Sequence, residues 1–127
     1  MNTVLDLNRK KRDYMVIAME DGEKVFVKRP TKVLMDYVAD YFDAFEAYQK
    51  EIAKLDMEKD VEEILAKSNE QIERMYDAVA RVLSNNKEGK EFTADMLMET
   101  LITDDAHEIM FTYQAFVSGL AEGLEKK

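Results

Sequence analysis

Two consecutive stretches of the chain carry apolar residues at alternating spacings of four and three, the signature of a heptad repeat. In the first stretch these positions are Leu34, Val38, Tyr41, Phe45, Tyr48, Ile52 and Leu55. In the second they are Val61, Leu65, Ser68, Ile72, Met75, Val79 and Val82, with Ser68 as the polar member. This spacing places each set on one side of an α-helix. The pattern therefore predicts two long helices, over residues 31–56 and 60–84.

The polar connection between these two helices is short, so they fold back most simply as an antiparallel helical hairpin with seam against seam. Turn-forming residues at 84–90 then break the pattern. Beyond them we expect a short helix over 93–102 and a closing helix over 104–125, which has a broad apolar face. The larger part of the chain is thus predicted to be a helical hairpin followed by C-terminal helices.

Residues 1–29 are predicted to be β. The β-rich runs 14–19 and 24–27 flank Asp21-Gly22, a dipeptide that suits a two-residue type I′ turn. That register sets Glu20 opposite Glu23, a like-charge pair, so a longer turn stays open as an alternative. Residues 4–7 are a candidate third strand. The fold class is mainly α with a small N-terminal antiparallel β element (α+β), in a single domain over residues 1–127.

Both faces of the predicted hairpin are apolar. With a two-residue turn, Val16, Ala18, Val25 and Val27 share one face, and Met15, Ile17, Met19 and Phe26 share the other. A ribbon of two or three strands is marginally stable alone. We therefore expect one face to pack on the helices and the other on a partner, a second copy or more of the chain. Met15, Ile17, Met19 and Phe26 are the candidate partner-binding residues here.

Three aromatic residues of the helices are further candidates for partner binding. Tyr37 and Phe42 flank the first seam and widen its apolar arc beyond what one neighbouring helix covers, unless the hairpin and the last helix cover the rest. Phe111 is nearly opposite the apolar face of the last helix, so it is either covered by the 85–92 loop or exposed to a partner. Nine methionines add side chains that adapt to varied apolar surfaces.

The residues offer little for catalysis. The chain has no cysteine, one histidine (His107) and two serines, Ser68 and Ser118. We interpret Ser68 as a small seam residue and His107 as an exposed residue at a helix start. The four glycines match neither a phosphate loop nor a dinucleotide motif. We therefore expect a binding protein and not an enzyme, with no cofactor and no metal.

Charge and hydropathy limit the classes of partner and the cellular location that we expect. The net charge is −9, and residues 33–127 carry twenty-two Asp or Glu against ten Lys or Arg. An acidic surface repels phosphates, so we expect no nucleic-acid binding, and we interpret the basic run at 9–12 as a solvated turn. No stretch has the length and hydropathy of a membrane span, and the N-terminus lacks the order of a signal peptide. The expected location is the cytoplasm.

The order of these elements resembles a known family. A short apolar strand ending in Leu5-Asp6-Leu7-Asn8 precedes an Asp21-Gly22 hairpin that leads to Pro30. Two long acidic helices, an Asn/Gly loop and a closing helix follow. Over essentially the whole chain this layout resembles the tail assembly chaperones of long-tailed (siphovirus-type) phages and prophages of Gram-positive bacteria.

The resemblance implies a function. Proteins of that family bind the hydrophobic, helical tape measure protein and help the tail tube protein to polymerise around it. They act in the bacterial cytoplasm and are absent from the mature virion. A longer frameshifted form is common, and Lys126-Lys127 would suit an A-rich slippery site. A structural or adaptor protein of a phage or prophage particle is the alternative, and an acidic DNA mimic is a weaker one. A homo-oligomer is a further prediction.

Overall fold

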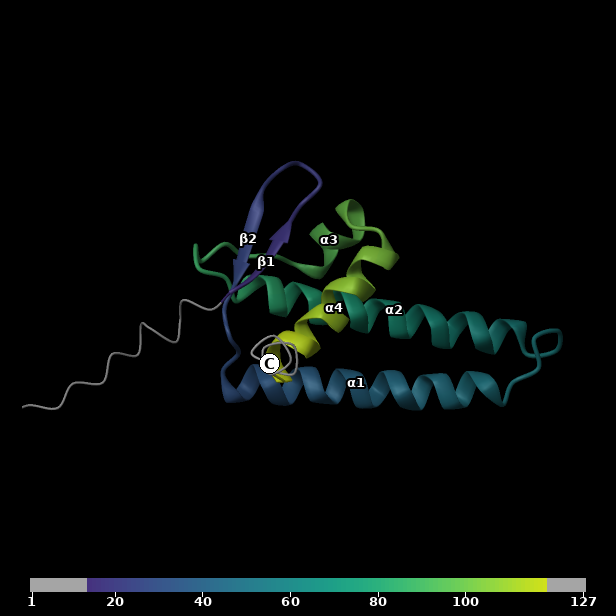
Figure 1. Ribbon diagram of the computed structural model, residues 1–127. Coiled ribbons are helices and arrows are strands. Elements are labelled where there is room, and N and C mark those ends of the chain that lie inside the picture. The colour runs from purple at the N-terminus through teal and green to yellow at the C-terminus, as the bar shows by residue number, and fades with distance from the viewer. Residues whose placement is uncertain (1–13, 119–127) are drawn as a thin grey trace, which may run out of the picture.

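The computed structural model describes residues 14–118, which form four helices and a two-stranded antiparallel sheet (Figure 1). In chain order the elements are β1 (Met15–Ala18), β2 (Lys24–Val27), α1 (Lys32–Ala53), α2 (Val61–Ser84), α3 (Ala94–Thr100) and α4 (Thr103–Ser118). The predicted fold class, mainly helical with an N-terminal antiparallel hairpin, is confirmed. The candidate strand at 4–7, the basic run at 9–12 and the predicted end of the last helix lie outside the described residues.

The long helices α1 and α2 pack as the predicted antiparallel hairpin. The Thr31 hydroxyl caps α1 by accepting a hydrogen bond from the Leu34 amide at 3.3 Å. Across the hairpin the hydroxyls of Tyr48 and Ser68 are 2.9 Å apart, which confirms Ser68 as a seam residue. α1 ends at Ala53, three residues before the predicted end. The Asp56 carboxylate accepts amide hydrogen bonds from residues 58 and 59 and so holds the turn that follows.

The core lies at one end of this helical hairpin. All eight buried residues of α2 lie between Gln71 and Leu83. There α2 packs against β2, α3 and α4, while α1 contributes Val38 and Tyr41. No residue between 42 and 70 is buried. We call this part the distal arm, and its outer end extends beyond the sheet and the two short helices in Figure 1.

The two seams face each other as expected, but the seam positions in the first half of α2 remain partly exposed. Val61 is 45% exposed and Leu65 is 61% exposed, although both occupy seam positions. Ile72, near the base of the arm, is also exposed. A pair of helices buries only the residues at the line of contact, and among the described elements α4 reaches the arm only at its base, where His107 and Phe111 contact aromatic rings of α1. Periodicity identifies one face of a helix but does not show how much of that face a neighbour covers.

The predicted register of the β hairpin is wrong by one residue. Met15 pairs with Val27, and Ile17 pairs with Val25. The turn has three loop residues, 20–22, because the Met19 amide donates to the Glu23 carbonyl at 2.7 Å and the Gly22 amide donates to the Met19 carbonyl at 2.9 Å. Gly22 has a φ of 91°, as the last residue of a type I turn with a G1 bulge does. The longer turn thus forms, and Glu20 does not face Glu23.

Because side chains alternate between the two faces of a strand, this one-residue shift moves each side chain of β2 to the opposite face from the one predicted. Met15, Ile17, Val25 and Val27 share the face that packs on the helices. The predicted grouping of Phe26 with Met15 and Ile17 is therefore wrong. Phe26 lies on the outer face, half-buried, with its ring edge-on to Tyr14 at 6.0 Å between centroids.

Helix α4 contacts α1 through aromatic rings. The centroid of His107 lies 5.3 Å from that of Phe45, and the centroid of Phe111 lies 5.6 Å from that of Phe42. His107 is half-buried, so the expectation of an exposed helix-start residue is wrong. Phe111 lies against α1 and not under the 85–92 loop, and it remains 46% exposed. We call Phe42, Phe45, His107 and Phe111 the aromatic cluster.

Candidate functional site

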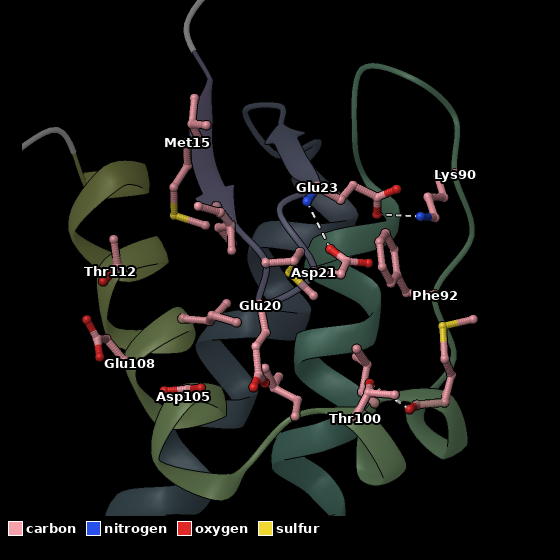
Figure 2. Close-up of a pocket in the computed structure, with 18 residues that line it drawn as sticks. Met15, Glu20, Asp21, Glu23, Lys90, Phe92, Thr100, Asp105, Glu108 and Thr112 are labelled. Carbon is pink, nitrogen blue, oxygen red and sulfur yellow. Dashed lines mark hydrogen bonds and ion pairs between the residues drawn. The ribbon is translucent and has the colours of Figure 1, made fainter.

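A groove of about 790 Å³ lies between the β hairpin, α3 and α4 (Figure 2). The hairpin side of this groove carries the apolar side chains of Met15, Ile17 and Met19. The opposite side carries Met96 of α3 and Ile109 of α4, among others. Met15 and Met19 of the hairpin thus meet Met96 of α3, which is far from them in the sequence. We call it the hairpin groove.

Local structure explains why the hairpin and the short helices stand apart here. Thr93 caps α3 by accepting a hydrogen bond from the Met96 amide at 3.2 Å. α3 is only seven residues long, and Leu101 follows it in an extended conformation. The Tyr76 hydroxyl of α2 donates to the Leu101 carbonyl and holds this turn in place. The chain then reverses into α4, so α3 and α4 form two walls that face the inner side of β1.

The groove combines a packed floor with adaptable edges. Leu97, Phe92 and Ile109 are buried and belong to the core. Met96, in contrast, is 42% exposed, and Met19 is partly buried. Unbranched methionine side chains adjust to apolar surfaces of different shape at low cost. The groove can therefore accept an apolar partner without disturbing the floor.

The rim of the groove is acidic. Glu20, Asp21 and Glu23 border it from the hairpin turn, and Asp105 and Glu108 border it from α4 (Figure 2). Among the described residues that line the groove, Lys90 is the one basic side chain, and it forms an ion pair with Glu23. The Asp21 carboxylate accepts a hydrogen bond from the Glu23 amide at 2.9 Å. Within the described part of the chain, no ion pair neutralises Glu20, Asp105 or Glu108.

The predicted partner-binding residues fall into separate places. Met15, Ile17 and Met19 come together in the hairpin groove. Phe26 lies on the outer face of the sheet. Phe42 and Phe111 meet in the aromatic cluster on the α1–α4 side.

Tyr37 belongs to the contact between α1 and α2. Its hydroxyl donates to the Asp77 carboxylate at 2.7 Å, and the Arg81 guanidinium lies over its ring, 4.2 Å from the centroid. Burial and, second, this hydrogen bond raise the pKa of Tyr37 to about 12. The ring and hydroxyl of Tyr37 are thus engaged within the molecule.

Sequence reasoning missed the other side of the groove. Phe92, Met96 and Leu101 line it, as do Asp105 and Glu108. Met96 and Leu101 were recognisable as apolar positions of a short helix. Nothing in the sequence pattern indicated that this helix faces the β hairpin, because that contact depends on how the chain turns between α3 and α4.

Two further kinds of feature, a metal site and a membrane-spanning helix, can be sought in the described residues from their side chains and hydropathy. Within residues 14–118 no three His, Asp or Glu side chains cluster closely enough to hold a metal ion. No helix of this part of the chain has the length and hydropathy needed to cross a membrane.

Comparison with known proteins gives no relative. The chain matches no protein-family model, no curated protein sequence and no solved structure. The family resemblance of the element order therefore stays a prediction.

Proposed function

We propose that this protein is a tail assembly chaperone of a long-tailed phage or prophage, and that it holds an apolar segment of the tape measure protein in the hairpin groove. The Met-rich groove on an acidic chain carries this proposal. The resemblance of element order supplies the client and the context. That context is the cytoplasm of a bacterial host, where the tail tube protein assembles around the tape measure protein.

Binding of this kind depends on burial of apolar surface and requires no cofactor and no turnover. A long hydrophobic helix is insoluble because its apolar face meets water. A groove with apolar walls covers part of that face, while the surrounding carboxylates keep the complex hydrated. Holding a client and keeping it in solution then follow from the same molecule.

The aromatic cluster favours a second candidate function, that of a structural or adaptor protein in a phage or prophage particle. Phe111 is 46% exposed and lies beside Phe42 on a surface apart from the groove. Aromatic side chains on a surface are typical anchors of stable protein interfaces. A permanent component would be found in purified virions, whereas a chaperone would be absent from them.

Coexpression with the tape measure protein from the neighbouring gene tests the proposed function. We expect the protein to raise the soluble fraction of the tape measure protein, and we expect Met96→Glu to abolish this effect by placing a charge in the groove. Met98→Glu is the matched control, because Met98 is also on α3 and also 42% exposed but does not line the groove.

The two results have separate meanings. If the unmodified protein leaves the tape measure protein insoluble, the chaperone proposal is wrong. If both methionine variants act alike, the client does not bind in the groove.

A further inference from the structure

The hairpin groove is apolar inside and negatively charged at its rim. We infer that it selects protein segments whose apolar residues are flanked by lysine or arginine. This inference rests on the proposed function only for the identity of the client. The chemistry of the selected segment comes from the rim of the groove.

The carboxylates that border the groove come from two elements, the hairpin turn and α4. Glu20 and Asp21 are on the hairpin turn, and Asp105 and Glu108 are on α4 (Figure 2). A segment that lies between Ile109 and Met96 therefore has acidic groups close to it, from the hairpin turn and from α4. Lysine or arginine near those groups would form ion pairs, while aspartate or glutamate would meet like charge.

The one lysine of the lining does not cancel this field. Lys90 is paired with Glu23 at the side of the groove near Phe92, away from Asp105 and Glu108 (Figure 2). The pair links the hairpin turn to the loop before α3. The carboxylates of Glu20, Asp105 and Glu108 remain available to a partner.

The acidic rim also disfavours other classes of ligand. Phosphate groups of nucleic acids and of anionic lipids would meet five carboxylates and a single ammonium group, so the rim repels both. Sites for small molecules place a few polar groups at converging positions within an apolar cavity. Here the charged groups lie at the border of the apolar floor and not within it, an arrangement that suits an amphipathic segment of a protein.

Two synthetic peptides test the inference on the full chain. Each has fourteen residues with leucine at helical spacing, and the other positions are lysine in one peptide and glutamate in the other. We expect the lysine peptide to bind on the order of tenfold more tightly in fluorescence anisotropy at physiological salt, since each exposed ion pair contributes a factor of roughly two to five. Equal affinity of the two peptides would overturn the inference.

Charge-reversal variants test whether the carboxylates at the groove cause the preference for the lysine peptide. Glu20→Lys with Glu108→Lys should weaken binding of the lysine peptide by about tenfold, because both carboxylates border the groove. Asp43→Lys with Glu73→Lys is the matched control: both residues are exposed on the long helices, neither lines the groove, and the change in net charge is the same. An equal loss in both double variants would mean that the net charge of the molecule attracts the peptide, and the inference would be wrong.

A photocrosslinking residue at Thr112, which lines the groove, identifies the occupant directly. Crosslinks to the lysine peptide support the inference. Crosslinks only to a second copy, or only to residues 1–13 of the same chain, would overturn it, because the groove would then already have another occupant.

Failure of this inference is distinguishable from failure of the proposed function. If the two peptides bind equally but Met96→Glu still abolishes solubilisation of the tape measure protein, the proposed chaperone function is supported and the inferred selection by charge is wrong. If the lysine peptide binds in the groove and the tape measure protein stays insoluble, the inferred charge selection is supported and the natural client is another protein.

Discussion

At the scale of single residues, two buried tyrosines differ in whether their hydroxyl groups are satisfied. The Tyr113 hydroxyl is buried with no hydrogen-bond partner among the described residues, whereas the Tyr76 hydroxyl donates to the Leu101 carbonyl. Removing an unsatisfied buried group is neutral or stabilising, while removing one partner of a buried hydrogen bond costs about 1 kcal/mol. We expect Tyr113→Phe to raise the free energy of unfolding slightly or leave it unchanged, and Tyr76→Phe to lower it.

Urea denaturation followed by far-UV circular dichroism measures both changes. The two variants remove the same atom from the same residue type, so each is the control for the other. A loss of stability in Tyr113→Phe comparable to that in Tyr76→Phe would show that the Tyr113 hydroxyl does have a partner.

The tyrosines also predict alkaline sensitivity. Burial, and second the hydrogen bond to Asp77, raise the pKa of Tyr37 from 10.0 to about 12, and burial raises the pKa of Tyr113 as well. Below pH 10 both the folded and the unfolded chain keep these protons, so this contribution to stability is complete. Between about pH 10 and pH 12 only the unfolded chain releases them, so the free energy of unfolding falls as pH rises.

Urea midpoints measured on either side of pH 10 test this prediction. Tyr37→Phe has no phenolic proton to lose, so its stability should depend less steeply on pH than that of the unmodified chain. An identical slope in the two proteins would mean that the Tyr37 hydroxyl titrates normally in the folded state.

At the scale of secondary structure elements, Asn86 joins three parts of the fold. Its buried side-chain amide donates to the Leu83 carbonyl at 2.7 Å and to the Lys90 carbonyl at 2.6 Å, and its side-chain oxygen accepts from the Lys90 amide at 2.9 Å. Its backbone forms a bridge with Val27 of β2. We expect Asn86→Ala to lower the free energy of unfolding by roughly 2 kcal/mol, because it leaves buried backbone groups without partners.

Asn86→Asp refines this test in the same denaturation experiment. Aspartate keeps the acceptor for the Lys90 amide but loses both donors and brings a negative charge next to two carbonyl oxygens. The loss should therefore be at least as large as for alanine. An aspartate variant as stable as the unmodified protein would contradict the role of the side-chain amide.

The hairpin shows which features of an element can be predicted from sequence. The runs at 14–19 and 24–27 indicated the strands correctly, and the heptad spacing indicated α1 and α2 to within a few residues. The register failed because Asp21-Gly22 suits both a two-residue turn and a three-residue turn with a bulge. The like-charge pair Glu20 and Glu23 was the signal that favoured the second, and it separates the two by little energy.

The candidate site was predictable only in part for a related reason. Alternation along β1 identified Met15, Ile17 and Met19 as an apolar row. The facing wall depends on α3 and α4, whose orientation is set by the Tyr76–Leu101 hydrogen bond and by the extended residue after α3. These long-range contacts leave no periodic pattern in the sequence.

At the scale of the whole molecule, burial is unevenly distributed along the helical hairpin. Residues 75–83 of α2 contain most of the buried positions of that helix, whereas residues 42–70 contain none. Leu65 and Met57, both exposed, lie in the arm. The molecule thus joins a packed body, where the groove lies, to an arm that is held mainly by contacts between two helices.

This difference predicts a gradient of local stability. Opening the end of the arm breaks few apolar contacts, so amide hydrogens of residues 46–68 should exchange on the order of a hundredfold faster than those of residues 75–83. The Tyr48–Ser68 hydrogen bond and the Glu51–Lys67 ion pair, at 2.6 Å, are polar side-chain interactions that join the helices there. Hydrogen exchange followed by mass spectrometry measures the gradient.

Tyr48→Phe separates local opening from global unfolding. It removes one of these two interactions, so exchange should become faster over residues 46–68 and stay unchanged over residues 75–83. If both regions respond equally, the arm opens only when the whole molecule unfolds, and the helical hairpin is a rigid element. If only the arm responds, its seam positions Val61 and Leu65, which are already partly exposed, become more accessible without any loss of the groove in the body.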